Sequence, residues 1–164
     1  METPDREIVF VPAKTGEQFT LQGGLTLRVM EDGSNTDNRI GAVELIIPAN
    51  TKGPPPHWHE MHDETFLVTQ GTVRFHAKDG KHVDAKAGDY IVVPTKVSVI
   101  VRAAHTFSNP TDEEARFFNT FTPAHYVNYF RLMNKWSLEG QKMDPEKVKK
   151  AMAYFATVGV DGPL

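Results

Sequence analysis

The chain of 164 residues contains no cysteine. This absence excludes disulfide bonds and thiolate metal sites, so His, Asp or Glu would have to hold any metal ion. Positive charge is also scarce, with 18 Lys and Arg against 21 Asp and Glu. That balance gives no electrostatic reason to expect nucleic acid or an anionic membrane as a partner. No apolar run approaches the ~20 residues of a membrane span, so neither kind of partner is predicted.

Signals for export and for several common enzyme classes are missing as well. The N-terminal stretch METPDREIVFVPAKTGEQ has no basic segment followed by an apolar one, so we expect a cytoplasmic protein. The sequence has no GxSxG, Walker A or GxGxxG motif. Its length favours a single domain with a hydrophobic core of its own.

Short β-prone runs separated by turn signals fill most of the chain. Many short strands with closely spaced turns are typical of an antiparallel sandwich or small barrel, so the predicted fold class is all-β. Asp79-Gly80 is a residue pair preferred in type I′ hairpin turns. The expected strands cover residues 8–12, 25–30, 40–47, 64–69, 72–77, 89–93, 97–102 and 115–121.

The C-terminal part changes character and predicts a helix over about 145–157. Asp144-Pro145-Glu146 is a typical helix start, and Gly159 is read as the stop. The helix would present one apolar stripe, formed by Val148, Ala151, Met152 and Phe155. We therefore expect a barrel over 1–134, including N-terminal strands, and a C-terminal helical segment over 135–164 packed on it within a single domain.

A cluster of imidazoles and carboxylates follows three prolines in GPPPHWHEMHDETFLVTQG, residues 53–71. His57 and His59 point to the same face of a strand, because side chains alternate along it. Glu64 joins that face if the chain turns through 60–63 and starts a second strand. Two neutral imidazoles and a carboxylate then suit a divalent first-row metal.

The fourth ligand should come from a distant strand, and His105 is the candidate because it opens the alternating run HTFSN. His62 is left open between a solvent-facing turn residue, a residue that contacts a ligand, and a substitute ligand. A triad of His82, Asp84 and His105 is an alternative metal site. The other alternative is that these residues form a surface cluster that binds no metal. His76, His82 and His125 are otherwise read as solvent-exposed or satisfied core residues.

These residues resemble the cupin family. The first cupin motif, G-x5-H-x-H-x3–4-E-x6-G, is matched from His57 to Gly71, although only three residues separate Gly53 from His57. The second motif, G-x5-P-x-G-x2-H-x3-N, is matched at Gly88, Pro94, His105 and Asn109. The resemblance covers residues 40–122 and implies a small antiparallel jelly-roll barrel with His57, His59, Glu64 and His105 as metal ligands.

The second motif departs from the family pattern beside the expected metal site. Lys96 replaces the glycine, and SVIVRA, residues 98–103, looks like a six-residue insertion. This β-prone segment could extend a hairpin at the barrel mouth, shift the register, or displace His105. We hypothesise that His105 still binds the metal.

The chain is further similar to small quercetin 2,3-dioxygenase-like cupins in ARFFNTFTPAHYVNYF, residues 115–130. That resemblance implies a metal-dependent dioxygenase acting on an aromatic or enolisable small molecule, with Glu64 as the catalytic base and Fe, Ni, Mn, Co, Cu or Zn as the cofactor. Inward-facing apolar residues would line the pocket. A homodimer is expected from the family. Non-oxidative isomerases, cyclases and decarboxylases, and a non-catalytic binding protein, remain alternatives. The predicted pocket residues are Phe66, Val68, Phe107 and Phe121.

Overall fold

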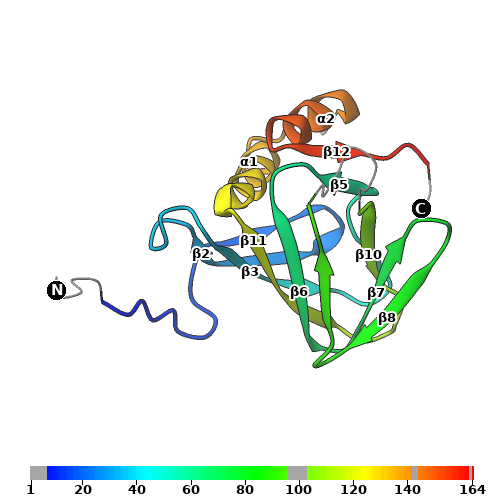
Figure 1. Cartoon of the computed structure of the whole chain (residues 1–164), viewed down its shortest axis with the longest axis horizontal. Coiled ribbons are helices and arrows are strands. Elements are labelled where there is room, and N and C mark those ends of the chain that lie inside the picture. The colour runs from blue at the N-terminus through cyan, green and yellow to red at the C-terminus, as the bar shows by residue number, and fades with distance from the viewer. Residues whose placement is uncertain (1–6, 96–102, 142–143, 163) are drawn as a thin grey trace.

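Two antiparallel sheets pack face to face, with two helices at one end of them (Figure 1). The computed structural model describes residues 7–95, 103–141, 144–162 and 164. The first sheet contains, in spatial order, β1 (Gln18–Thr20), β2 (Thr26–Asp32), β3 (Gly41–Ile47), β11 (Ala115–Thr122), β6 (Asp63–Gln70) and β9 (Tyr90–Val93). The second contains β12 (Thr157–Gly159), β5 (His57–His59), β10 (His105–Asn109), β7 (Thr72–Ala77) and β8 (His82–Lys86), with β4 (Thr51–Lys52) paired to β10.

The core lies between the inner faces of the two sheets. Phe117 of β11 is fully buried and meets the rings of Phe66 and Phe107 edge to face, with both centroid distances at 5.1 Å. Phe66 belongs to the first sheet and Phe107 to the second, so these rings join the two layers. The alternation of buried and exposed residues along β11 is the period of two that a half-buried strand requires. The all-β fold with a C-terminal helix is therefore confirmed.

Most predicted strands form where the sequence placed them, with small shifts at their ends. The predicted Asp79-Gly80 turn between β7 and β8 has φ values of 65° and 69°, as a type I′ turn needs. The strand predicted over 8–12 is wrong: these residues are coil, and Ile8 is 97% exposed. A β-prone run without a neighbouring strand has nothing to pair with. The predicted strand 97–102 falls almost wholly outside the described residues.

The C-terminal prediction needs two corrections. Helix α2 (Pro145–Tyr154) starts as expected, with the Asp144 side chain accepting from the Glu146 N–H at 2.8 Å. It ends earlier than predicted, because Ala156 adopts a φ of 51° and the chain then forms β12. Gly159 therefore lies in a strand and does not stop a helix.

Helix α1 (Val127–Leu138) was not predicted. It is preceded by η2 (Ala124–Tyr126), a 3₁₀ turn that follows β11. Its contacts are with β1, β2 and β3, and it buries Val127 and Met133. The division of the chain at residue 134 stays a prediction, and α1 runs across that position.

The side chain of Asn109, at the end of β10, forms hydrogen bonds with the segments that surround it. Its amide nitrogen donates to the carbonyl oxygens of Ile47, Pro48 and Glu113 at 2.7–3.2 Å. Its side-chain oxygen accepts from the backbone N–H and the hydroxyl of Thr111. The side chain is 1% exposed, so solvent does not reach the carbonyl groups that it binds and cannot take over these hydrogen bonds.

We therefore expect Asn109→Ala to lower the free energy of unfolding by about 2–4 kcal/mol, because it leaves buried carbonyl groups without donors. Urea denaturation of the metal-free protein measures this loss. Asn128→Ala is the control, because Asn128 is exposed on α1 and should change stability by less than about 0.5 kcal/mol. Equal effects of the two substitutions would contradict the assigned role of Asn109.

Candidate metal centre

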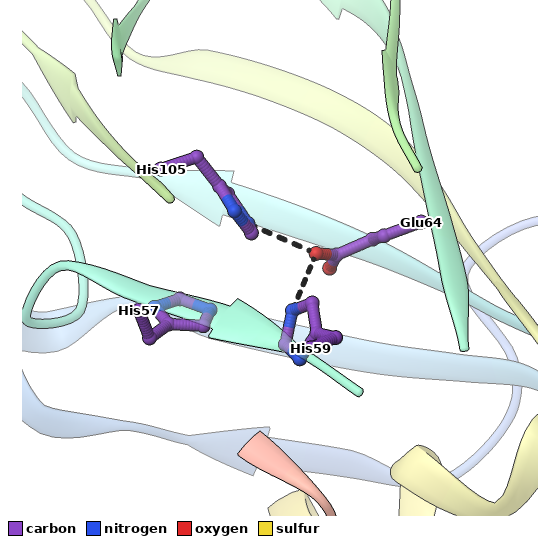
Figure 2. Close-up of side chains that lie close together, drawn as sticks. All are labelled: His57, His59, Glu64 and His105. Atoms are coloured by element: carbon purple, nitrogen blue, oxygen red, sulfur yellow. Dashed lines mark hydrogen bonds and ion pairs between the residues drawn. The ribbon is translucent and has the colours of Figure 1, made fainter. Parts of the chain in front are cut away.

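Strand β5 presents two histidines to the interior. His57, Trp58 and His59 are all buried, at 6%, 6% and 3% exposure. Because side chains alternate along a strand, the two imidazoles share one face, as the spacing predicted (Figure 2). Three prolines precede the strand and restrict the backbone at its entry.

The other two residues of the predicted set come from different strands. Glu64 lies near the start of β6 in the first sheet and is paired with Phe121 of β11. His105 opens β10 in the second sheet, directly opposite His57. One suitable atom from each of His57, His59, Glu64 and His105 lies within 4.8 Å of the others. The cluster therefore joins the two sheets, and the structure brings all four residues together (Figure 2).

Each imidazole has its Nδ1 atom fixed by a neighbour. Nδ1 of His57 lies 2.8 Å from the carbonyl oxygen of Pro55, and Nδ1 of His105 lies 3.1 Å from that of Ala103. A carbonyl can only accept, so both Nδ1 atoms carry the proton and both Nε2 atoms have a free lone pair. Nδ1 of His59 lies 3.0 Å from Oγ1 of Thr157. Such outer partners are what metal-binding histidines require.

The inward side of the cluster therefore consists of lone pairs. Nε2 of His59 and Nε2 of His105 lie 3.0 and 3.1 Å from the same Glu64 oxygen, Oε2. With Nδ1 of His105 already protonated, its Nε2 can donate to Glu64 only if the ring takes a second proton and becomes cationic. Otherwise, imidazole lone pairs and a carboxylate face one another in a buried site. A cation among them resolves this arrangement, so the residues fit a divalent metal.

The spacing is also compatible with an ion. Ligand atoms about 2.0–2.2 Å from a metal stand roughly 3–4 Å apart. The observed spread of 4.8 Å or less therefore closes with small side-chain movements. Three imidazoles and one carboxylate are a donor set that several first-row metals accept.

The charges at the site favour ligands that are free of protons at neutral pH. Burial opposes ionisation of Glu64, but its contacts with His105 and His59, which donate to the carboxylate when their rings are protonated, outweigh burial and hold the pKa of Glu64 well below its ordinary value. Burial and the neighbouring imidazoles lower the pKa of His57 to about 3. The carboxylate is therefore charged and His57 is neutral, the forms that bind a metal.

His62 is buried, and the reading of it as a solvent-facing turn residue is wrong. Its ring lies 4.0 Å from that of His59 and 4.5 Å from that of Tyr126. Its Nε2 is the one buried side-chain atom among the described residues that lacks a hydrogen-bond partner. Turn position alone suggested exposure, but the segment after β11 covers it. Glu60 and Asp63 on either side are exposed, as expected.

The predicted pocket residues all lie in the hydrophobic core. Phe66 and Phe121 are the two that approach histidines of this region, with ring centroids 6.2 Å from His105 and 5.7 Å from His62. Val68 and Phe107 are buried in the same core, and Phe107 packs on Phe75 and Phe117. Sequence reasoning missed Tyr126, whose ring lies 5.0 Å from that of His59.

The alternative triad of His82, Asp84 and His105 does not assemble. Both oxygens of Asp84 are taken by Arg74, at 2.6 and 2.7 Å, on the exposed face of β7 and β8. The proposed insertion at residues 98–103 lies outside the described part of the chain except for Ala103. His105 is nevertheless in the cluster, so the structure shows no displacement of this residue.

Comparison with known families identifies the fold. Residues 43–121 match the family model of the Cupin domain. This match supports the cupin superfamily as the family that the chain resembles. The match contains all four clustered residues, and a buried cluster of three histidines and one glutamate suits a metal site typical of cupins.

Solved structures with the same fold carry different activities in their names. A sugar phosphate isomerase from a cupin superfamily of Silicibacter pomeroyi is 23% identical, with 63% of this chain and 61% of that one covered at a TM-score of 0.53. A predicted oxalate decarboxylase from Thermotoga maritima is 18% identical, with 71% of this chain and 99% of that one covered at a TM-score of 0.59. The polyketide cyclase RemF from Streptomyces resistomycificus is 16% identical, with 74% of this chain and 93% of that one covered, also at a TM-score of 0.59.

Two further comparisons gave negative results. No curated protein sequence matches this chain significantly. Within the described ranges, every helix is too short or too polar to span a bilayer.

The metal-free protein should lose stability as the pH falls from about 6.5 towards 3. Burial lowers the pKa of both His57 and His62 to about 3, so the folded state cannot take the protons that the unfolded chain takes below pH 6.5. We expect a loss on the order of 3 kcal/mol between pH 7 and pH 5 in urea denaturation with a chelator present.

Substitution separates these two histidines from the rest of the protein. His62→Phe should reduce the pH dependence roughly by half, since it removes one of the two groups. His82→Ala, an exposed control, should leave it unchanged. Stability that is flat between pH 7 and pH 5 would show that the buried imidazoles do not behave as described.

Proposed function

We propose that this protein is a metal-dependent enzyme acting on an aromatic or enolisable small molecule, most simply a dioxygenase of the quercetinase type. The observation that carries the proposal is the convergence of three imidazole nitrogens and a carboxylate oxygen whose other polar contacts are already satisfied. His57, His59, Glu64 and His105 would hold one divalent ion of Fe, Ni, Mn, Co, Cu or Zn.

The roles of the ion and the protein are separate. When bound, the metal supplies Lewis acidity towards an enol or phenol oxygen and a template for the reactants. Glu64 supplies the base: its carboxylate is ionised at neutral pH and is buried. An enol proton within hydrogen-bond reach of its other oxygen, Oε1, would pass to it. His57, His59 and His105 keep their orientation through their Nδ1 contacts.

The surroundings favour a flat, partly polar substrate. The rings of His62, Phe121 and Tyr126 lie in mutual contact next to His59. A substrate hydroxyl would give the unpartnered Nε2 of His62 the hydrogen bond that it lacks. Among the described residues, the buried polar and charged side chains are His, Asn, Glu and Thr, with no Lys or Arg. This composition supports an aromatic substrate over a phosphorylated sugar.

Two other functions use the same site. A non-oxidative isomerase, cyclase or decarboxylase would need only proton transfer through Glu64, and such activities appear in the names of structural relatives. A binding protein without turnover would keep the ligand contacts and need no base. Turnover that does not need oxygen would distinguish the non-oxidative enzyme from the dioxygenase. Ligand binding that does not need Glu64, without turnover, would distinguish the binding protein.

The proposal is tested with protein loaded with Fe, Ni, Mn or Co and incubated with flavonols, with and without air. We expect oxygen uptake by at least one metal form, and a loss of at least ~100-fold in kcat/KM for Glu64→Gln and for His105→Ala. His76→Ala is the control, because His76 bonds Ser108 away from the cluster.

Each other outcome points to a different function. Turnover of the substrate without oxygen would replace the dioxygenase by a non-oxidative enzyme. Ligand binding without turnover, unchanged by Glu64→Gln, would leave the binding protein. Absence of oxygen uptake with every metal and substrate would overturn the dioxygenase.

We further propose a homodimer that uses the N-terminal segment. Ile8 and Phe10 are 97% and 82% exposed on a chain segment that runs away from the sheets (Figure 1). Large apolar side chains gathered in a β-prone run are typical of interaction surfaces.

Sedimentation should therefore give twice the chain mass of 18.4 kDa. The double substitution of Ile8 and Phe10 by Ser should shift the protein to the monomer. Val83→Ser, which changes an exposed residue of β8, should leave the dimer intact. A monomeric wild-type protein at micromolar concentration would contradict the dimer.

A further inference from the structure

Strand β5, which carries two of the four clustered residues, depends on the C-terminal strand for most of its pairing. Among the described residues, it forms one pair with β10, His105 opposite His57. It pairs with β12 along its whole length, with Thr157 opposite His59 and Gly159 opposite His57. Two more backbone hydrogen bonds extend this ladder, from the Glu60 N–H to Ala156 and from the Val160 N–H to Pro56.

The side chain opposite His59 makes a specific polar contact with it. Thr157 is 1% exposed, and its hydroxyl donates to the carbonyl oxygen of Phe155 at 3.3 Å. A hydroxyl has one proton and two lone pairs. With its proton given to Phe155, Oγ1 can only accept from Nδ1 of His59, which lies 3.0 Å away. This contact leaves Nε2 of His59 with its lone pair directed at Glu64.

A second buried group supports the hydroxyl from the other side. Tyr126 is hydrogen-bonded to Thr157, and burial raises the pKa of Tyr126 well above its ordinary value. The hydroxyl of Thr157 therefore has three polar neighbours, the carbonyl oxygen of Phe155, Nδ1 of His59 and the phenol of Tyr126, and together they restrict its orientation.

Helix α2 holds β12 in this place. The predicted apolar stripe buries Ala151, Met152 and Phe155, and the Phe155 ring packs 5.7 Å from that of Tyr129. The chain then reverses at Ala156 and enters β12 directly. A helix that looks like a covering element therefore positions a side chain that contacts His59.

We propose that the C-terminal strand is a working part of the metal centre, in which Thr157 is a positioning residue that fixes the tautomer and orientation of His59. This inference rests on the proposed metal site. The cupin family match ends at residue 121, and Thr157 lies 98 positions beyond His59. Metal affinity in this chain is accordingly set in part by a segment outside the matched domain.

The test compares three variants in which position 157 or its neighbour changes. Thr157→Val keeps the shape but removes the hydroxyl, Thr157→Ser keeps the hydroxyl, and Val158→Thr alters a partly exposed position on the opposite face of β12. The affinity of the full chain for Co²⁺ and Zn²⁺ is measured by competition with a chromophoric chelator, and thermal unfolding is measured without metal.

Thr157→Val should weaken metal binding by about 10–100-fold, as loss of such outer contacts does. The metal affinity of Thr157→Ser should stay within about 3-fold of the wild-type value, and the affinity of Val158→Thr should equal the wild-type value. Rescue by serine distinguishes positioning from packing, because serine loses the methyl group that valine retains. Wild-type affinity in Thr157→Val, or equal weakening by serine and valine, would overturn the inference.

A second measurement does not depend on the variants folding. In ¹⁵N NMR spectra of the Zn²⁺-loaded wild-type protein, Nδ1 of His59 should carry a proton and Nε2 should show the shift of a metal ligand. A proton on Nε2 and the shift of a metal ligand on Nδ1 would overturn the inference, although the metal site itself would still stand. A wild-type protein that binds neither metal would overturn the proposed function itself, and the inference with it.

Discussion

Four hydrogen-bond acceptors meet in a buried space between two sheets, and the rest of this structure is arranged around that constraint. The Nδ1 atoms of His57 and His105 face backbone carbonyls, which forces their lone pairs inwards. Glu64 adds a full negative charge at a buried position. Such an arrangement is unstable by itself, because the charge is buried and neutral imidazoles oriented in this way present lone pairs to it. A divalent ion would neutralise it with ligands that are already oriented.

The topology explains how such a site can be built in a small protein. His57, His59 and His105 belong to one sheet and Glu64 to the other, so sheet-on-sheet packing itself sets their distance. The aromatic core at Phe66, Phe107 and Phe117 fixes that packing. Rings of His62 and Tyr126 cover the same end of the core, and Nε2 of His62 is buried there without a hydrogen-bond partner.

The sequence predicts the parts of the site that depend on local spacing. A period of two places His57 and His59 together, a predicted turn, which in the structure spans residues 60–62, brings in Glu64, and the alternating run at HTFSN marks His105. The residues that it does not predict owe their positions to long-range packing. His62 sits in a turn and is covered by Tyr126 from a distant segment, and Thr157 lies in a strand of three residues that pairs with β5. Helix α1 and the unpaired run at 8–12 show the same limit, since tertiary partners decide both.

The function proposed for this protein depends on direct binding of one metal ion by these four side chains. X-ray absorption spectroscopy of the purified protein loaded with one equivalent of Co²⁺ or Ni²⁺ tests this claim most directly. We predict scattering from about three imidazole rings and from oxygen ligands at roughly 2.0–2.2 Å, with imidazole scattering reduced by one ring in His105→Ala. Bound metal that shows no imidazole scattering, or a spectrum unchanged in His105→Ala, would contradict it.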